Sequence, residues 1–369
     1  MGEQRKTRLA LIGTNGIPAQ YGGGETFYEN LTRGLSSKYD ITVYCSKNQP
    51  KEKFGDSYLG AKLKYWNLNA NGWQSIIYDA ISILHAAIHS DILYLFGPAG
   101  TIVVRLLRMF GFKKKVIMNC GGLNEWEREK FSPLAKWYLK KSFAIVKGKI
   151  IYVVDNNLYA KNLNETFGIK DAVVIRYGGD NARKEDVNDE LLAKYPFLNE
   201  EYYVSVSRAQ VDNNLHIVMD AFSKMPDKKL VLVSNFEVSD YGQELYEKYQ
   251  ECDNLVLIPG VYDKKEINAI RSHALAYVHS HSRCGTPPSL CEAMNLALPI
   301  ISYDVEVNHE VTGGNALFFE SSEELQQAIT NITKVELKKM AERSYEFAKK
   351  KLTWEYIWEQ YTDLFENHL

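Results

Sequence analysis

The stretch LALIGTNGIPAQYGGGETF, residues 9–27, places five glycines between an apolar run and an amphipathic segment. The run Leu9–Ile12 predicts a buried strand, and the segment from Glu25 to Leu35 has helical spacing. In an open parallel sheet, ligands bind at the carboxyl ends of strands, where glycine lets backbone amides approach a phosphate or sugar beside a helix N-terminus. A strained turn, with Glu25 as a favourable acid in the first helical turn, explains the same glycines.

The alternation of β-branched apolar runs with amphipathic segments continues along the chain and is typical of βαβ units with parallel sheets. A polar, charge-rich passage, residues 178–199, interrupts it. Strands are expected near residues 9–12, 41–45, 92–96, 116–119, 150–154, 173–176, 203–206, 230–233, 255–258, 276–279 and 300–303. The pattern predicts two Rossmann-like, doubly wound α/β domains, residues 1–180 and 181–350. Residues 351–369 have aromatic side chains at helical spacing and are expected to pack back towards the first domain.

Composition narrows the class of protein. The chain has 369 residues, a hydrophobic fraction of 45%, a charged fraction of 24% and a formal net charge of -2, which suits a globular enzyme and gives no global reason to bind nucleic acid. Its five cysteines are scattered and lack metal-type pairing, so free thiols are expected. We find no signal-length apolar core and no run of about 20 apolar residues. A cytoplasmic protein, with at most peripheral membrane contact, is therefore expected.

Two passages in the second half contain residues suited to a nucleotide diphosphate. In VSRAQVDNNLHIVMDAF, Arg208 ends a strand, where a guanidinium can grip a diphosphate, and Asn213 and Asn214 precede a helix. A surface ion pair explains Arg208 equally well. In the second passage, residues 277–304, Glu292 stands one turn into a helix that follows a Gly-Thr-Pro-Pro-Ser loop. Its carboxylate can accept both hydroxyls of a ribose, while the Ser289 and Leu290 amides face phosphate oxygens.

A nicotinamide-dependent oxidoreductase is an alternative for the N-terminal stretch. Its glycines match the dinucleotide pattern GxGxxG poorly, and residues 44–47, YCSK, stand where an acidic residue should follow the second strand. This alternative predicts a nicotinamide absorbance change during turnover.

Five groups of motifs occur in order over nearly the whole chain: IGTNGIPAQYGGGETF at the start, GGLNEWEREKF at 121–131, IRYGGD at 175–180, SRAQVDNN at 207–214, and HSRCGTPPSLCEAM with YDVEVNHEV at 281–294 and 303–311. Together they resemble the family 4 glycosyltransferases of GT-B fold, and within them the rhamnosyltransferase-type branch of bacterial capsule and O-antigen assembly. The resemblance implies two domains facing across a cleft, the first for the acceptor and the second for the nucleotide sugar. It also implies transfer with retention of configuration, dTDP-rhamnose as donor and a lipid-linked glycan, such as one on undecaprenyl diphosphate, as acceptor.

Carried over by position, the resemblance makes Arg208 the ligand of the donor diphosphate and Glu292 that of the ribose, and these two are the expected catalytic residues. The expected donor-binding residues are Gly23, Gly24, Asn213, Asn214, His281, Thr286, Ser289, Leu290 and Glu310. Trp126 and Arg128 are expected to shape the acceptor site. The alternatives are a structural hydrogen bond for His281, a helix cap for Glu310, a core position for Trp126 and a solvated surface position for Arg128.

The chain departs from the family pattern at three places. Asn213 stands where the general family has a lysine, and Cys284 where it has the first of two glutamates; the branch's glutamate near that place corresponds to Ser282. Residues 120–126, CGGLNEW, stand where the branch has Asp-Gly-Leu-Glu-Trp. These departures leave open a sugar other than rhamnose, a UDP- or GDP-sugar donor, and a transferase-like binding or regulatory protein without transfer activity.

The charged residues bear on two questions, how the leaving group is stabilised and whether the protein contacts a membrane. Sugar transfer builds negative charge on the departing phosphate, which many GT-A enzymes neutralise with a metal on Asp-x-Asp. That tripeptide is absent from the sequence, so we expect transfer without a metal site or a cofactor. The segments 103–115 and 128–149 interleave lysines and arginines with aromatics, which favours peripheral contact with an anionic membrane. Nucleic acid is not an expected partner, and solvated helix faces are the alternative for both segments.

Overall fold

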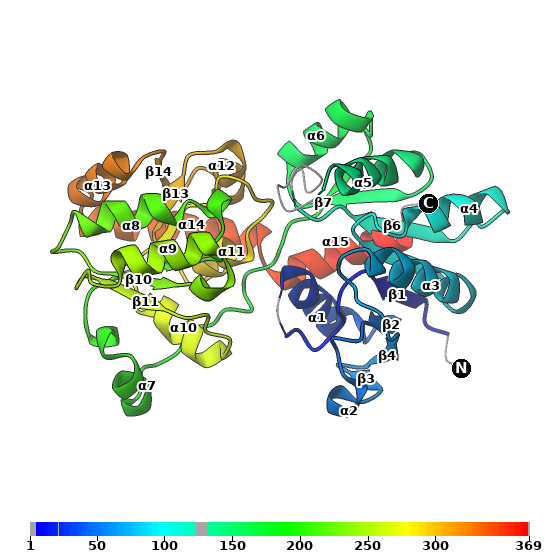
Figure 1. Ribbon diagram of the computed structural model, residues 1–369, viewed down its shortest axis with the longest axis horizontal. Helices are drawn as coiled ribbons and strands as arrows, with labels where there is room; N and C mark the ends of the chain where they lie inside the picture. The colour runs from blue at the N-terminus through cyan, green and yellow to red at the C-terminus, as the bar shows by residue number, and fades with distance from the viewer. Residues whose placement is uncertain (1–4, 21, 123–131, 368–369) are drawn as a thin grey trace. The chain divides into compact units, whose positions relative to one another are not determined.

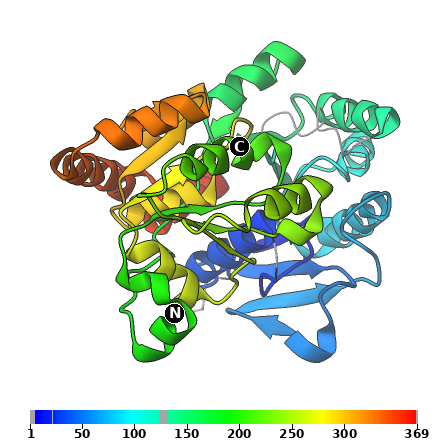
Figure 2. The ribbon, with the colours of Figure 1, turned by 60° about the vertical axis from the view of Figure 1, so that its left-hand side comes forward.

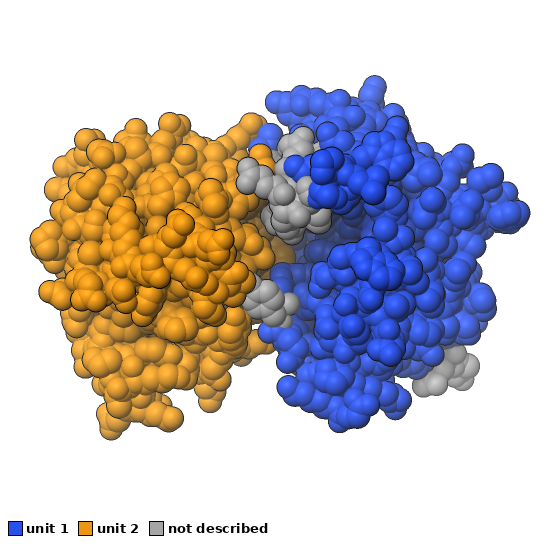
Figure 3. Space-filling model, in the orientation of Figure 1, with its two compact units in different colours: residues 1–176, 357–369 blue, residues 177–356 orange. Residues whose placement is uncertain are grey.

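The computed structural model describes residues 5–20, 22–122 and 132–367. The chain divides into two units, which Figure 3 shows in different colours. Unit 1 comprises residues 1–176 with 357–369, and unit 2 comprises residues 177–356.

Unit 1 is built on a sheet whose described strands run in the order β3-β4-β2-β1-β5-β6-β7-β8 (Figure 1). Neighbouring strands are parallel, except that β3 pairs with β4 antiparallel. The strands are β1 (Arg8–Ile12), β2 (Asp40–Cys45), β3 (Ser57–Tyr58), β4 (Ala61–Tyr65), β5 (Ile92–Phe96), β6 (Lys115–Asn119), β7 (Ile151–Val154) and β8 (Val173–Val174). The helices are α1 (Gly23–Leu35), α2 (Lys51–Phe54), α3 (Gln74–His89), α4 (Thr101–Met109), α5 (Pro133–Ile145) and α6 (Asn157–Phe167).

Unit 2 repeats the doubly wound plan with a parallel sheet in the order β11-β10-β9-β12-β13-β14. Figure 2 shows the ribbon of this unit in green, yellow and orange. The strands are β9 (Tyr203–Val206), β10 (Leu230–Val233), β11 (Leu255–Ile258), β12 (Ala276–His279), β13 (Ile300–Tyr303) and β14 (Leu317–Phe319). The helices are α7 (Asp189–Lys194), α8 (Leu215–Ser223), α9 (Asp240–Tyr249), α10 (Lys264–Ser272), α11 (Pro288–Asn295), α12 (Glu306–Thr312), α13 (Ser322–Asn331) and α14 (Lys334–Lys351).

The strand sequences explain both cores. Apolar runs such as Leu9–Ile12 and Leu230–Val233 are buried on both faces of their sheets, as parallel strands covered by helices require. The amphipathic helices then bury one stripe each. The polar passage 178–199 differs from a simple linker, because it contains α7 and a short 3-10 helix, Pro196–Asn199, and lies in unit 2.

Helix α15 (Trp354–Asn367) begins in unit 2, and its residues from Ile357 onward belong to unit 1. There, Trp358 Nε1 donates to the carbonyl of Asn30 at 2.9 Å, and the hydroxyls of Tyr361 and Tyr94 hydrogen-bond at 2.9 Å. The buried aromatic face of this helix is thus part of the core of unit 1. Among the described residues, no helix combines the length and the apolarity that crossing a membrane requires.

Candidate functional site

The topology of each sheet selects one place for a ligand. The chain leaves β9 in one direction towards β10 and β11, and returns to the other side of β9 at β12. Ligands of open parallel sheets bind beyond the carboxyl ends of the strands at such a reversal. In unit 2 this place lies after Val206 and His279, and in unit 1, by the same rule, after Ile12 and Phe96.

Several hydrogen bonds join the two loops that meet at this place in unit 2. Ser280 Oγ donates to the Asn213 carbonyl at 2.5 Å, and Asn214 Nδ2 donates to the Ser280 carbonyl at 3.0 Å. The Ser282 amide donates to the Asp212 carbonyl at 3.0 Å. The loops after β9 and β12 are therefore held together as one surface.

Arg208 is exposed on this surface, and its guanidinium makes no hydrogen bond or ion pair within the part of the chain that the structure describes. Its backbone is fixed, because its carbonyl accepts hydrogen bonds from Asn213 Nδ2 at 2.8 Å and the Gln210 amide at 2.9 Å. Asn213 and Asn214 were predicted to bind the donor, yet both side-chain amides hydrogen-bond to backbone carbonyls. They position the loop that presents the Arg208 guanidinium.

His281 lies next to Arg208 in this arrangement. Its Nε2 is 2.8 Å from Ser207 Oγ, and its carbonyl accepts a hydrogen bond from Asn308 Nδ2 at 3.0 Å. Burial, and secondarily the charge of Arg208, lower the pKa of His281 to about 3. The imidazole is therefore neutral at physiological pH and contributes hydrogen bonding without a second positive charge.

Glu292 lies on α11 and is already engaged. Its Oε2 is 2.8 Å from Arg271 Nη1, and its Oε1 accepts a hydrogen bond from Asn181 Nδ2 at 2.7 Å. The side chains of Arg271 and Glu292 are only 7% and 15% exposed, so this is a largely buried ion pair. Trp354 Nε1 donates to Asn181 Oδ1 at 3.0 Å and extends the network. The carboxylate keeps further lone pairs for a ligand, but it also neutralises a buried cation.

The remaining donor residues lie around the start of α11 and on α12. Thr286 is buried in the loop before α11, and Ser289 is half-buried in the first turn. The Leu290 amide, expected to face a phosphate, instead donates to the Pro287 carbonyl at 3.1 Å. Glu310 is half-buried and lies inside α12, so the helix-cap alternative is wrong, while its contact with the donor stays a prediction.

The glycines after the first strand of unit 1 differ in whether the fold leaves room for a side chain. Gly13 and Gly16 have φ of 104° and 107°, and a Cβ on them would lie 2.6 Å from the Phe96 carbonyl oxygen and 2.5 Å from Cys45 Sγ. The fold itself requires these two. Gly23 is exposed at the start of α1, has no positive φ, and a Cβ there would meet nothing within 4 Å. Gly24 is intermediate, because its Cβ would lie 3.1 Å from the Phe96 ring.

Sequence reasoning missed three residues of the site and predicted two that lie outside the described residues. Arg271, Asn181 and Asn308 hold Glu292 and His281, but nothing in their local sequence sets them apart. Trp126 and Arg128 lie outside the described residues.

Comparisons with known proteins agree with this architecture. Residues 187–351 match the family model described as glycosyl transferases group 1, and residues 6–180 match the one described as domain of unknown function (DUF1972). A search of curated proteins finds no match.

Solved structures match over almost the entire chain. The sucrose-phosphate synthase (tll1590) from Thermosynechococcus elongatus is 16% identical, with 98% of each chain covered and a TM-score of 0.81. Anabaena Alr3699/HepE in complex with UDP and glucose is 14% identical, with 97% of this chain and 99% of that chain covered and a TM-score of 0.75. WaaG, a glycosyltransferase involved in lipopolysaccharide biosynthesis, is 13% identical, with 97% and 100% covered and a TM-score of 0.72.

These findings define the class of protein. The fold is that of the GT-B glycosyltransferases, which confirms the predicted pair of parallel-sheet α/β domains. Together with the group 1 match over most of unit 2, it supports a glycosyltransferase.

Proposed function

We propose that the protein is a retaining glycosyltransferase that moves a sugar from a nucleotide diphosphate to a glycan acceptor. The observation that carries the proposal is the guanidinium of Arg208, which has no partner among the described residues and is presented from a fixed loop at the topological reversal of unit 2. The group 1 match covers the same residues, and the Anabaena structure contains UDP and glucose.

In this proposal, Arg208 supplies the positive charge that the leaving group needs. The bond between the sugar C1 and the diphosphate oxygen breaks, and negative charge grows on that oxygen. A guanidinium can bind two phosphate oxygens at once, and His281, which is neutral, can donate or accept a hydrogen bond beside it. Glu292 receives the ribose with the lone pairs that Arg271 and Asn181 leave free. We propose that no metal is required for this stabilisation, so transfer should survive EDTA.

The donor and the acceptor are assigned by resemblance to the rhamnosyltransferase branch of family 4. dTDP-rhamnose is the proposed donor, and a UDP- or GDP-sugar is the alternative. The proposed acceptor is a lipid-linked glycan of surface polysaccharide assembly, bound by unit 1, with Trp126 and Arg128 in its site. Gly23 and Gly24 are proposed to lie close to the bound sugar nucleotide.

The surface of unit 1 supports action at an anionic membrane. Helix α4 packs against both α3 and α5 (Figure 1), and each of these helices exposes an apolar stripe. The stripes are Ile77, Ile81, Leu84 and Ile88 on α3, Ile102, Leu106 and Met109 on α4, and Leu134, Trp137 and Ile145 on α5. Exposed apolar stripes on neighbouring helices mark an interaction site.

The charges around these stripes favour lipid as the partner. Ranges 74–89, 97–122 and 132–154 contain ten lysines and arginines, and their single acidic residue, Asp79, is buried. Arg108 and Lys114 donate to carbonyls at helix ends and strengthen the fold, whereas Lys113, Lys141, Lys147 and Lys149 are exposed. We propose that this face contacts the inner leaflet of the cytoplasmic membrane, with each cation contributing about 1 kcal/mol.

Vesicle sedimentation tests this contact. Binding to phosphatidylglycerol-containing vesicles, weak binding to phosphatidylcholine alone, and loss of binding in Ile88→Asp are expected. Val335→Asp is the matched control, because Val335 is also an exposed apolar residue, 63% against 73% for Ile88, and lies in unit 2. The proposal is contradicted if the protein binds phosphatidylcholine vesicles as strongly as phosphatidylglycerol-containing ones, or if Ile88→Asp binds vesicles as strongly as the wild type.

A binding or regulatory protein of GT-B fold is the second candidate, favoured by Asn213 and Cys284 in place of the general family's Lys and Glu. A panel of dTDP-, UDP- and GDP-sugars separates the two candidates. Release of a nucleoside diphosphate in the presence of acceptor supports the transferase. Tight donor binding with no release, across all acceptors, supports the binding protein.

A further inference from the structure

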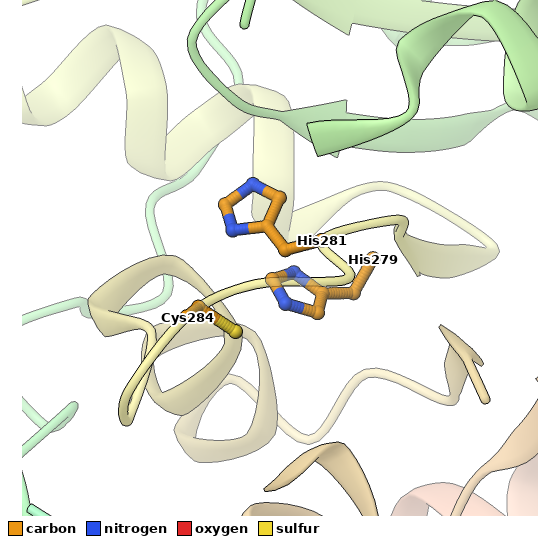
Figure 4. Close-up of side chains that lie close together, drawn as sticks. All are labelled: His279, His281 and Cys284. Carbon is orange, nitrogen blue, oxygen red and sulfur yellow. The ribbon is translucent and has the colours of Figure 1, made fainter. Parts of the chain in front are cut away.

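Three side chains of the kind that bind transition metals meet at the carboxyl end of β12. His279 is the last residue of the strand, and His281 and Cys284 follow in the loop. One candidate ligand atom from each lies within 4.8 Å of the others. Figure 4 shows the two imidazoles and the thiol gathered around one place. No metal site was predicted from the sequence, because Asp-x-Asp is absent and the cysteines lack metal-type pairing.

His279 supplies the first argument for a ligand here. Its side chain is buried, with 1% of the residue exposed, and its Nε2 has no hydrogen-bond partner within the described ranges. Buried ring nitrogens are normally satisfied, since an unmade hydrogen bond in the interior is costly. A bound cation would satisfy this nitrogen.

His281 is oriented as metal-binding histidines are. Its Nε2 lies 2.8 Å from Ser207 Oγ, which leaves Nδ1 for a ligand. Metal-ligating histidines characteristically donate their other ring N–H to an oxygen, which fixes the tautomer and the ring. The centroids of the His279 and His281 rings are 4.3 Å apart, so both rings can reach one ion.

Cys284 completes the set. Its Sγ lies 3.7 Å from Asn308 Oδ1, and Asn308 is fixed because its Nδ2 donates to the carbonyls of His281 and Tyr303 at 3.0 and 2.9 Å. The thiol is half-buried, so solvent ions can reach it.

We propose that His279 Nε2, His281 Nδ1 and Cys284 Sγ form a binding site for a soft divalent cation of the Zn²⁺ class. Two imidazoles and a thiolate suit Zn²⁺, whereas Mg²⁺ and Ca²⁺ prefer oxygen ligands. Zn–N and Zn–S bonds of about 2.0–2.3 Å require the three ligand atoms to lie closer together than the 4.8 Å within which they now fall, so binding includes an adjustment of these side chains. Binding replaces the S–H bond of Cys284 by a Zn–S bond and releases one proton to solvent. The inference does not depend on sugar transfer.

Titration of the purified full chain with Co²⁺ and with Zn²⁺ tests the site. A thiolate-to-cobalt charge-transfer band, displaced by Zn²⁺, is expected at one equivalent. Cys284→Ser should abolish the band and weaken Zn²⁺ binding at least about tenfold. Cys284→Ala is the second variant if the serine destabilises the loop, and thermal unfolding establishes that each variant is folded.

Two controls keep the result specific. Cys252→Ser makes the same substitution in the same unit and should leave the band intact. His85 and His89 stack on α3 with ring centroids 4.2 Å apart and offer a competing site without a thiol, which His89→Asn removes. The proposal is overturned if wild-type protein gives no charge-transfer band, if Cys284→Ser retains it, or if only His89→Asn reduces Zn²⁺ binding.

Discussion

Arg208 and Glu292 lie in the same unit, follow neighbouring strands and were assigned to the same ligand, yet their surroundings differ. The guanidinium of Arg208 projects from a loop whose backbone is fixed by Asn213, and within the described part of the chain it has no partner. The carboxylate of Glu292 lies in a largely buried pair with Arg271. A charge without a structural partner is available to a ligand, whereas one that neutralises a buried partner also stabilises the fold. Substitutions at the two positions should therefore have different consequences.

The largest effect is expected at Glu292. Replacing it with Ala leaves Arg271 buried without its counter-charge, which should lower the free energy of unfolding by about 3–5 kcal/mol. Denaturant unfolding measures the loss, and the double variant Glu292→Ala/Arg271→Met should recover much of it. An unchanged unfolding midpoint in Glu292→Ala, with weaker donor binding, would mean that Glu292 serves only the ligand.

Asn213 should show an intermediate effect, because it acts on Arg208 through the backbone. Asn213→Ala removes the hydrogen bond to the Arg208 carbonyl and should cost about 1–2 kcal/mol of stability. Donor affinity should fall as well, since the loop that presents the guanidinium is less fixed. Asn331→Ala, at an exposed helix end, is the control in the same calorimetric and binding assays. If Asn213→Ala binds the donor as tightly as the wild type, the loop that Asn213 fixes does not contribute to donor binding.

Gly23 is the counterpart of Arg208 in unit 1, a position that the fold does not need. Because a Cβ there meets nothing and φ is not positive, Gly23→Val should change stability by less than about 1 kcal/mol. If backbone approaches a ligand here, transfer should be lost nonetheless. Gly13→Val is the contrasting control and should unfold the unit, because its Cβ would collide with the Phe96 carbonyl. If folded Gly23→Val transfers sugar normally, this stretch does not line the active site.

At neutral pH the smallest effect is expected from the protonation of His281, because its consequence for stability develops only on acidification. Its folded pKa of about 3 lies below the unfolded value, so the folded state binds fewer protons between about pH 3 and 6.5. Stability should therefore be fully present above pH 6.5 and fall on acidification through that window. Because His281 does not titrate between pH 6.5 and about 8, it should cause no change of donor affinity in that range. His281→Gln should reduce the acid-side slope only in part, because burial also lowers the pKa of His279. A slope as steep as that of the wild type would mean that His281 titrates normally.

The strand pattern was predictable because buried parallel strands are short apolar runs with little ambiguity. Leu230–Val233 and Leu255–Ile258 occur where the sequence placed them. Strands β3, β4 and β14 were missed: β3 has only two residues, Lys62 and Lys64 interrupt β4, and β14 has only three residues. Whether a site residue is free to bind a ligand was not predictable, because this depends on partners that are distant in the sequence. Arg271 lies 21 positions before Glu292 and Asn181 lies 111 positions before it, and neither is marked by its neighbours.

The glycine stretch also shows that the role of a residue depends on parts of the chain that are distant in the sequence. Its composition predicted a turn at the mouth of the first strand, and Gly13 and Gly16 are needed there. Which glycine the fold could spare depends on Phe96 and Cys45, which approach from other strands. Only the three-dimensional arrangement separates Gly23 from Gly13.

The affinity of Arg208→Gln for the best donor nucleotide is the most direct test of the account. Isothermal titration of wild type, Arg208→Gln and the exposed control Arg343→Gln gives the comparison without requiring an acceptor. Loss of one charged hydrogen-bonding group should weaken binding by roughly 1.5–3 kcal/mol, about 10- to 150-fold, with unchanged unfolding. Wild-type affinity in a folded Arg208→Gln, or equal losses in Arg208→Gln and Arg343→Gln, would contradict the claim that this guanidinium binds the donor diphosphate.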